Sequence, residues 1–162
     1  MPRKKTKSLK RDIKPDRVYN SVLVSKLINK TMRHGKKQTA ESLVYGAMEI
    51  AASKLKQDDP LAVLEQAIKN IKPNMEVKSR RVGGANYQIP FEVQGDRQLH
   101  LALMWFVSTI RERRGGMGKN SAEVMAAEIV DAFNESGVTV KKRNDTQAMA
   151  EANRAFAHFA RF

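Results

Sequence analysis

Residues 75–93, with the sequence MEVKSRRVGGANYQIPFEV, decide the fold because they predict two short strands joined at Gly83-Gly84. A Gly-Gly pair adopts positive φ without a steric cost, which favours a tight two-residue hairpin turn. Such a turn would place Arg80 opposite Tyr87 on one face of the hairpin. A longer turn remains an alternative and would change which residues share a face.

The hairpin is predicted to be an arm that projects from the body of the protein. Polar or basic side chains occur on both of its faces, so neither face can form the inner wall of a sandwich. Elsewhere the sequence offers no good strand to extend the pair, and Pro90 suits an edge strand because it lacks an N–H donor. A lone two-stranded ribbon is marginally stable in water. A basic arm that reaches for a partner is one interpretation, and a hairpin without a function is the other.

Six helices are predicted around the hairpin, because apolar residues recur there every three or four positions. The fold class is therefore mainly α: a six-helix bundle with one projecting two-stranded antiparallel β-hairpin arm at about 75–91. The fourth helix, which starts at residue 95, should be central, with Trp105 in the core and His100 at its edge. The last helix should start at Asp145, or as early as Val138. Its predicted buried stripe is Met149, Ala152 and Phe156.

Composition restricts the class of protein and of partner. A chain of 162 residues suits one domain, and it has no Cys and no apolar run long enough for a membrane span. The N-terminus lacks the apolar segment of a secretory signal, so we expect a cytoplasmic protein. Thirty Lys and Arg against 17 Asp and Glu give a net charge of +13. This excess predicts a polyanionic partner, nucleic acid first and an anionic membrane second.

The basic residues form six segments at helix ends and in loops. We expect a flexible basic tail at 1–17, a helical RNA-binding domain at 18–157 and a C-terminal tail at 158–162. Several segments are expected to share one face, away from the acidic residues Glu41, Glu49, Asp58, Glu123 and Asp131. The predicted RNA-binding residues are Arg3, Lys4, Lys5, Lys7, Lys10, Arg11, Arg33, Lys36, Lys37, Lys78, Arg80, Arg81, Tyr87, Arg111, Arg113, Arg114, Lys119, Lys141, Lys142, Arg143 and Arg154.

No pattern in the sequence predicts catalysis, a cofactor or a metal site. Ser-His-Asp order, HExxH and a nuclease-like acidic cluster are all missing. Residues 113–120 faintly resemble a phosphate-binding loop but lack its first Gly, its Ser or Thr and a preceding strand. The mixed aromatic and basic C-terminus from Arg154 suits stacking on single-stranded RNA or docking of its Phe rings on the protein itself.

Several motifs resemble one known family. RRVGGANYQIPFEV at 80–93, GKKQTAESLVYGA at 35–47 and MAEANRAFAHF at 149–159 are similar to segments of the bacterial small-subunit ribosomal protein seven family. The stretches at 70–77 and 15–21 continue the resemblance, which covers nearly the whole chain. The loop at 113–120 is richer in Gly than the family pattern, and the ending at 159–162 differs slightly.

The resemblance implies a structural, non-enzymatic constituent of the small ribosomal subunit. It implies a primary rRNA-binding protein that nucleates assembly of the 30S head on the 3′ major domain of 16S rRNA. Exit-site tRNA, mRNA, the decoding centre and neighbouring small-subunit proteins would lie close to it, with no membrane contact and no homo-oligomer. Some members of the family also repress translation of their own operon.

Two other classes compete with this interpretation. An architectural DNA-binding protein can insert basic β-arms into a minor groove, but the tip at Val82-Gly83-Gly84 is a poor apolar wedge. An RNA-modifying enzyme would need a catalytic site that the sequence does not show.

Overall fold

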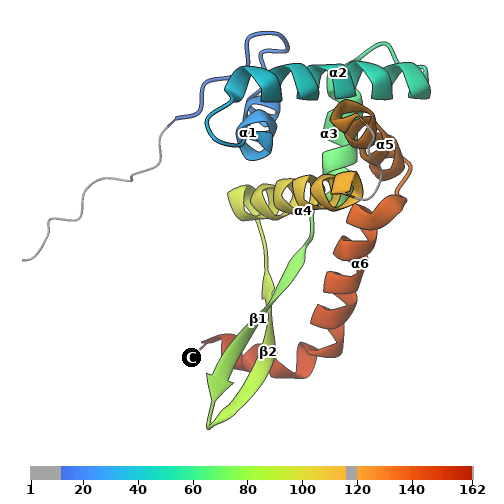
Figure 1. Cartoon of the computed structure of the whole chain (residues 1–162). Helices are drawn as coiled ribbons and strands as arrows, with labels where there is room; N and C mark the ends of the chain where they lie inside the picture. The colour runs from blue at the N-terminus through green and yellow to red at the C-terminus, as the bar shows by residue number, and fades with distance from the viewer. Residues whose placement is uncertain (1–11, 116–119, 162) are drawn as a thin grey trace, which may run out of the picture.

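A computed structural model describes residues 12–115 and 120–161 and places a helical body above a projecting hairpin (Figure 1). The predicted fold class, mainly α with a two-stranded antiparallel arm, is confirmed. In chain order the elements are α1 (Val22–Thr31), α2 (Lys37–Leu55), α3 (Pro60–Ile71), β1 (Met75–Val82), β2 (Ala85–Glu92), α4 (Gly95–Gly115), α5 (Ser121–Phe133), α6 (Gly137–Ala152) and the 3-10 helix η1 (Arg154–Arg161). Within these residues no helix is both long enough and apolar enough to cross a bilayer.

Side-chain caps begin two of the helices. The Asp59 carboxylate accepts a hydrogen bond from the backbone N–H of Leu61 at 2.8 Å, and Pro60 occupies the first position of α3. The Asn120 side chain accepts from the N–H of Ala122 at 3.3 Å and begins α5 in the same way. These local interactions fix the start of both helices before tertiary contacts are considered.

The hydrophobic core lies among α1 to α5. Val24, Leu27 and Ile28 of α1 pack with the small and apolar face of α2 and with Phe106 of α4, all buried. Trp105 is partly buried against this core. His100, however, is exposed on the surface of α4, so the prediction that it lies at the edge of the core is wrong.

The C-terminal third differs most from expectation. The helix α6 begins at Gly137, so residues 138–140 are helical, and the earlier of the two predicted starts is the observed one. The predicted stripe is wrong: Met149 is 50% exposed and Ala150, one residue further on, is fully buried. Thr139, Val140 and Ala150 are the buried residues of α6, and Phe156 belongs to η1 rather than to α6.

The hairpin has the predicted register. Val82 pairs with Ala85 and Arg80 with Tyr87, so the turn consists of Gly83 and Gly84, whose φ values are +57° and +93°. The longer turn is thereby excluded. Two faces of the hairpin are distinct, since successive side chains alternate along a strand.

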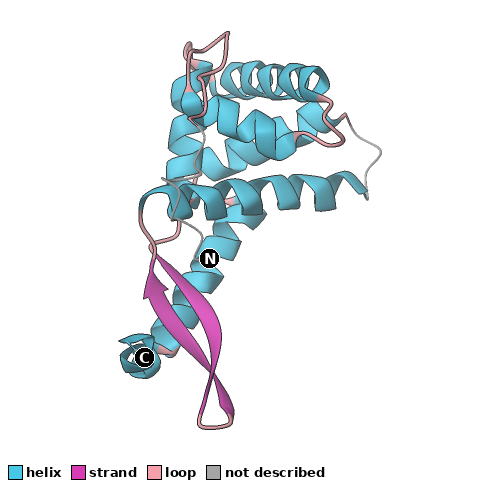
Figure 2. Ribbon diagram, turned by 90° about the vertical axis from the view of Figure 1, so that its left-hand side faces the viewer, coloured by secondary structure: helices cyan, strands magenta, loops and turns pink. Residues whose placement is uncertain are grey.

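The hairpin is not a lone ribbon. It projects below the helical body, but α6 runs alongside β1 and η1 turns back against β2 (Figure 2). Ile89 of β2 is fully buried and Pro90 is buried as well. This packing supplies the third layer that an isolated two-stranded ribbon needs for stability.

Candidate nucleic-acid interface

The tip of the hairpin carries two arginines free to meet a partner. Arg80 and Arg81 are exposed, and neither forms an ion pair with any described residue. Because they are adjacent on one strand, they project from opposite faces of the hairpin. Guanidinium groups in this setting can each make bidentate contacts with a phosphate.

A buried carboxylate partly compensates the basic residues at the base of the hairpin. The buried Glu76 carboxylate accepts from Lys78 Nζ at 2.7 Å and from Arg97 at 2.8 Å, and Lys78 also lies 5.1 Å from the centre of the Phe91 ring. Burial opposes ionisation of Glu76, but the hydrogen bonds from Lys78 and Arg97 outweigh it and keep the pKa of Glu76 below its ordinary value. Lys78 therefore brings less uncompensated charge than Arg80 or Arg81.

The aromatic C-terminus docks on the hairpin. The Tyr87 ring centre lies 5.2 Å from that of Phe156 and 5.3 Å from that of Phe159, and all three side chains are half-buried. These tilted geometries are favourable aromatic pairs. Of the two interpretations left open by the sequence, docking on the protein itself is the observed one. Arg154, at the start of η1, is exposed and has no ion pair within the described residues.

The turn between α1 and α2 forms a second basic site. Arg33 and Lys36 are exposed and without ion pairs among the described residues. Lys37 is the first residue of α2 rather than part of the loop, and its Nζ lies 3.9 Å from Glu41. Glu41 also pairs with Arg17 at 3.4 Å, so the prediction that this acid lies away from the basic segments is wrong.

The three arginines at the end of α4 have different roles. Arg113 contacts the fully buried Glu128 at 2.5 Å and Asp131 at 3.2 Å, so Asp131 also lies beside a basic segment, contrary to prediction. Its hydrogen bond to Glu128 and the nearby Asp131 raise the pKa of Arg113 against the opposing effect of burial. Arg111 donates to the backbone carbonyl of Lys30 at 3.1 Å, whereas Arg114 is exposed and unpaired within the described residues.

The basic cluster on α6 is also divided between structural and free cations. Lys142 Nζ lies 3.2 Å from the Glu112 carboxylate. Arg143 donates to the carbonyl of Asn70 and, at 2.8 Å, to the side chain of Asn144. Lys141 is exposed and has no ion pair in the described part of the chain.

The remaining predicted residues, Arg3, Lys4, Lys5, Lys7, Lys10, Arg11 and Lys119, lie outside the described residues. Among the described residues, some of the predicted RNA-binding cations form contacts that stabilise the fold, and others form no ion pair and are free to bind a partner. The free ones are Arg33, Lys36, Arg80, Arg81, Arg114, Lys141 and Arg154.

Sequence reasoning missed the anchor of the N-terminal segment. The Asp16 carboxylate accepts from the N–H groups of Val18, Tyr19 and Ser21 at 2.8–3.0 Å and from the Tyr45 hydroxyl at 3.3 Å. Burial favours the neutral acid, but these hydrogen bonds prevail and lower the pKa of Asp16. A cluster of Asp, Ser and Tyr before a helix signals this kind of turn only weakly.

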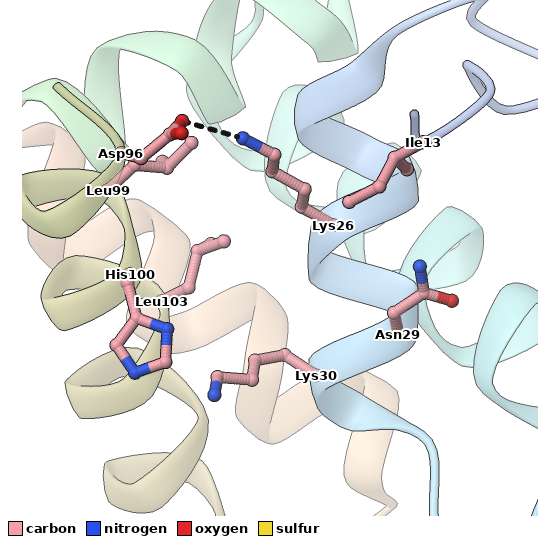
Figure 3. Close-up of a pocket in the computed structure, with 8 residues that line it drawn as sticks. All are labelled: Ile13, Lys26, Asn29, Lys30, Asp96, Leu99, His100 and Leu103. Carbon is pink, nitrogen blue, oxygen red and sulfur yellow. Dashed lines mark hydrogen bonds and ion pairs between the residues drawn. The ribbon is translucent and has the colours of Figure 1, made fainter. Parts of the chain in front are cut away.

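A cavity between α1 and α4 is lined by two lysines that are not among the predicted RNA-binding residues. Lys26 and Lys30 reach from α1 toward α4, where Lys26 Nζ lies 3.4 Å from Asp96 and Lys30 lies near His100 (Figure 3). The cavity is about 270 Å³. Burial, Lys30 and Arg97 together lower the pKa of His100, which favours the neutral imidazole. Lys26 and Lys30 are four residues apart in α1, so both lie on one face of that helix.

Comparison with known proteins decides the family. The model of the family described as ribosomal protein S7p/S5e matches residues 2–154. The chain belongs to the ribosomal protein S7p/S5e family. It is 58% identical to small ribosomal subunit protein uS7 of Dictyoglomus turgidum over 149 residues, covering 92% of this chain and 93% of that protein. It is 50% identical to the uS7 of Kosmotoga olearia over 156 residues, covering 96% and 98% of the two chains.

A third relative, uS7 of Thermotoga petrophila, is 54% identical over 149 residues, which cover 92% of this chain and 94% of that protein. Ribosomal proteins of the S7p/S5e family bind RNA and are structural rather than enzymatic. The predicted family and the prediction that this S7-family protein is not an enzyme are therefore confirmed.

Proposed function

We propose that this S7-family protein, a structural constituent of the small ribosomal subunit, is a primary rRNA-binding protein of the cytoplasmic ribosome. It nucleates assembly of the 30S head by binding the 3′ major domain of 16S rRNA. The observation that carries the proposal is the pair of unpaired arginines, Arg80 and Arg81, on a hairpin held in place by α6 and η1.

Electrostatics supports RNA as the partner. Free cations occur at the hairpin tip, at the turn after α1, at the end of α4 and on α6. A protein with many phosphate contacts binds through counterion release, so its affinity falls steeply with salt. Lys78 and Arg113 are held in ion pairs with Glu76 and Glu128 and therefore stabilise the fold. The cations without such ion pairs are the ones left to bind RNA.

The hairpin and the C-terminal segment form one unit, and this unit is the proposed neighbour of exit-site tRNA and mRNA near the decoding centre. Tyr87, held between Phe156 and Phe159, contributes by fixing that unit. Other small-subunit proteins contact the monomer in the assembled head. The tail at 1–17 and the segment at 158–162 flank the RNA-binding domain at 18–157. The protein also represses translation of its own operon, and the same surface binds that message.

The first test is the double substitution Arg80→Ala with Arg81→Ala. Binding to a fragment of the 16S rRNA 3′ major domain, measured by filter retention over a salt series, should weaken at least tenfold. The slope of log affinity against log salt should fall by roughly 1.5 to 2, since two phosphate contacts are lost. Thermal stability should stay unchanged because both side chains are exposed.

Lys54→Ala with Lys56→Ala is the matched control, because it removes the same charge from the exposed end of α2, far from the hairpin (Figure 1). Equal weakening by both double variants would show a diffuse charge effect and contradict the proposed interface. Equal affinity of the wild-type protein for duplex DNA of the same length would instead favour the architectural DNA-binding alternative.

A further inference from the structure

A second cavity, of about 300 Å³, opens where the C-terminal ends of α1 and α4 meet the start of α5. Arg33, Arg111 and Arg114 line it, together with Thr31 and Ser121. Its described lining contains no carboxylate. A cavity with three guanidinium groups and no acid is unusual, because like charges brought together repel one another unless an anion joins them.

The three guanidinium groups keep most of their donors available. Arg33 and Arg114 form no ion pair with a described residue, and Arg111 uses one N–H for the carbonyl of Lys30. Each guanidinium has five N–H donors in a planar fork that matches the oxygens of a phosphate. The cavity therefore presents many convergent donors and a net positive charge.

An unpaired hydroxyl adds independent support. Thr31 Oγ1 is buried and has no hydrogen-bond partner in the described structure, and Thr31 lines the cavity. Buried hydroxyl groups are nearly always paired, and an unpaired one suggests a missing partner. Towards an anion, a threonine hydroxyl can donate one hydrogen bond without any change of charge.

We propose that this cavity is a subsite for one tetrahedral oxyanion, a phosphate group of the RNA backbone, bound by Arg33, Arg111 and Arg114 with the Thr31 hydroxyl as a further donor. This rests on the proposed function, because the RNA supplies the phosphate. The start of α5 at Ser121 places a helix N-terminus at the same cavity, which adds favourable potential for an anion.

The decisive variant is Thr31→Val, which keeps the shape of the side chain and removes only the hydroxyl. Affinity for the rRNA fragment should fall at least about tenfold, as expected for one hydrogen bond to a charged group. The salt slope should stay the same, because no charge is removed. The Tm of the free protein should be unchanged or higher, since a buried unpaired hydroxyl is replaced by a methyl group.

Thr109→Val is the matched control. Thr109 Oγ1 is likewise buried and unpaired within the described residues, but it lies in the core on α4 and does not line the cavity. Its substitution should change Tm in the same direction as Thr31→Val and leave RNA affinity at the wild-type value. An equal loss of RNA affinity in both variants would overturn the proposal, and so would a Tm for Thr31→Val several degrees below that of the wild type.

A second arm tests the subsite without RNA. Inorganic phosphate should raise the Tm of the wild-type protein more than sodium chloride of equal ionic strength, and Thr31→Val should reduce this difference. No difference between the two salts would overturn the subsite. If the rRNA fragment failed to bind the wild type while phosphate still raised Tm, the proposed function would fall, and with it the assignment to RNA. Wild-type RNA affinity in Thr31→Val, with binding lost in Arg80→Ala/Arg81→Ala, would overturn the subsite alone.

Discussion

Arg113→Ala should lower the free energy of unfolding by about 3 kcal/mol, because it strands a buried carboxylate. Glu128 is fully buried, and its Oε2 lies 2.5 Å from the Arg113 guanidinium. After the substitution only the backbone N–H and the hydroxyl of Thr139 would still donate to Glu128. Loss of one partner of a buried ion pair typically costs about 3–5 kcal/mol. We take the lower end because the Arg113 side chain is 34% exposed.

Urea unfolding at pH 7 followed by the fluorescence of the single tryptophan, Trp105, measures this loss. The control is Arg114→Ala, because the neighbouring side chain is exposed and forms no ion pair with a described residue. It should change stability by no more than about 0.5 kcal/mol. In RNA binding the order reverses: folded Arg113→Ala should bind the rRNA fragment nearly as well as wild type, and Arg114→Ala should bind it more weakly with a smaller salt slope.

The double variant Arg113→Met with Glu128→Leu tests the mechanism. Replacement of both charges by apolar groups of similar size should recover part of the stability lost in Arg113→Ala, because no charge is left stranded although Thr139 loses its acceptor. A loss below about 1 kcal/mol in Arg113→Ala would refute the reasoning, since Glu128 would then be stabilised by other means. A loss of RNA affinity in Arg113→Ala as large as in Arg114→Ala would refute the division between structural and free arginines.

Two further predictions concern the packing of the chain ends. Tyr87→Ala removes two aromatic pairs worth about 1–3 kcal/mol together, so amide exchange in η1 should accelerate while exchange in α2 stays slow; unchanged exchange in η1 would contradict the docking. Asp16→Asn should lower stability at pH 7 by about 1.5 kcal/mol. Because the folded pKa of Asp16 is lowered, its contribution is present above the unfolded pKa of about 3.9 and is lost as pH falls through the folded value. Urea unfolding at pH 7 and pH 3 should therefore show a smaller difference between variant and wild type at pH 3, and an equal difference at both would contradict the linkage.

Local chemistry made much of the fold predictable. Gly83-Gly84 has one strongly favoured turn, and that turn fixes the register of every pair in the hairpin. Asp59-Pro60 and Asn120 begin helices through contacts with residues two positions away. At α6 the sequence left the start of the helix open, and the earlier start is the observed one because Thr139 and Val140 are buried in the body.

The division of the basic residues required the tertiary structure. Arg113 and Arg114 are adjacent and chemically identical, yet one lies against a buried glutamate 15 residues away and the other faces outward. Likewise, Lys142 pairs with Glu112 across two helices while Lys141 beside it stays free. No local pattern encodes such pairs, because the partners come from distant parts of the chain.

The sequence by itself therefore determined the hairpin, its two-residue turn, the overall excess of positive charge and, through its motifs, the family. These properties depend on neighbouring residues or on composition, so they do not need the fold to be known. Only the tertiary structure decided which cations are free, that η1 docks on the hairpin through Tyr87, and that Thr31 shares a cavity with three arginines. Those features arise where segments far apart in the chain meet, and their energies depend on burial and distance that a linear sequence does not contain.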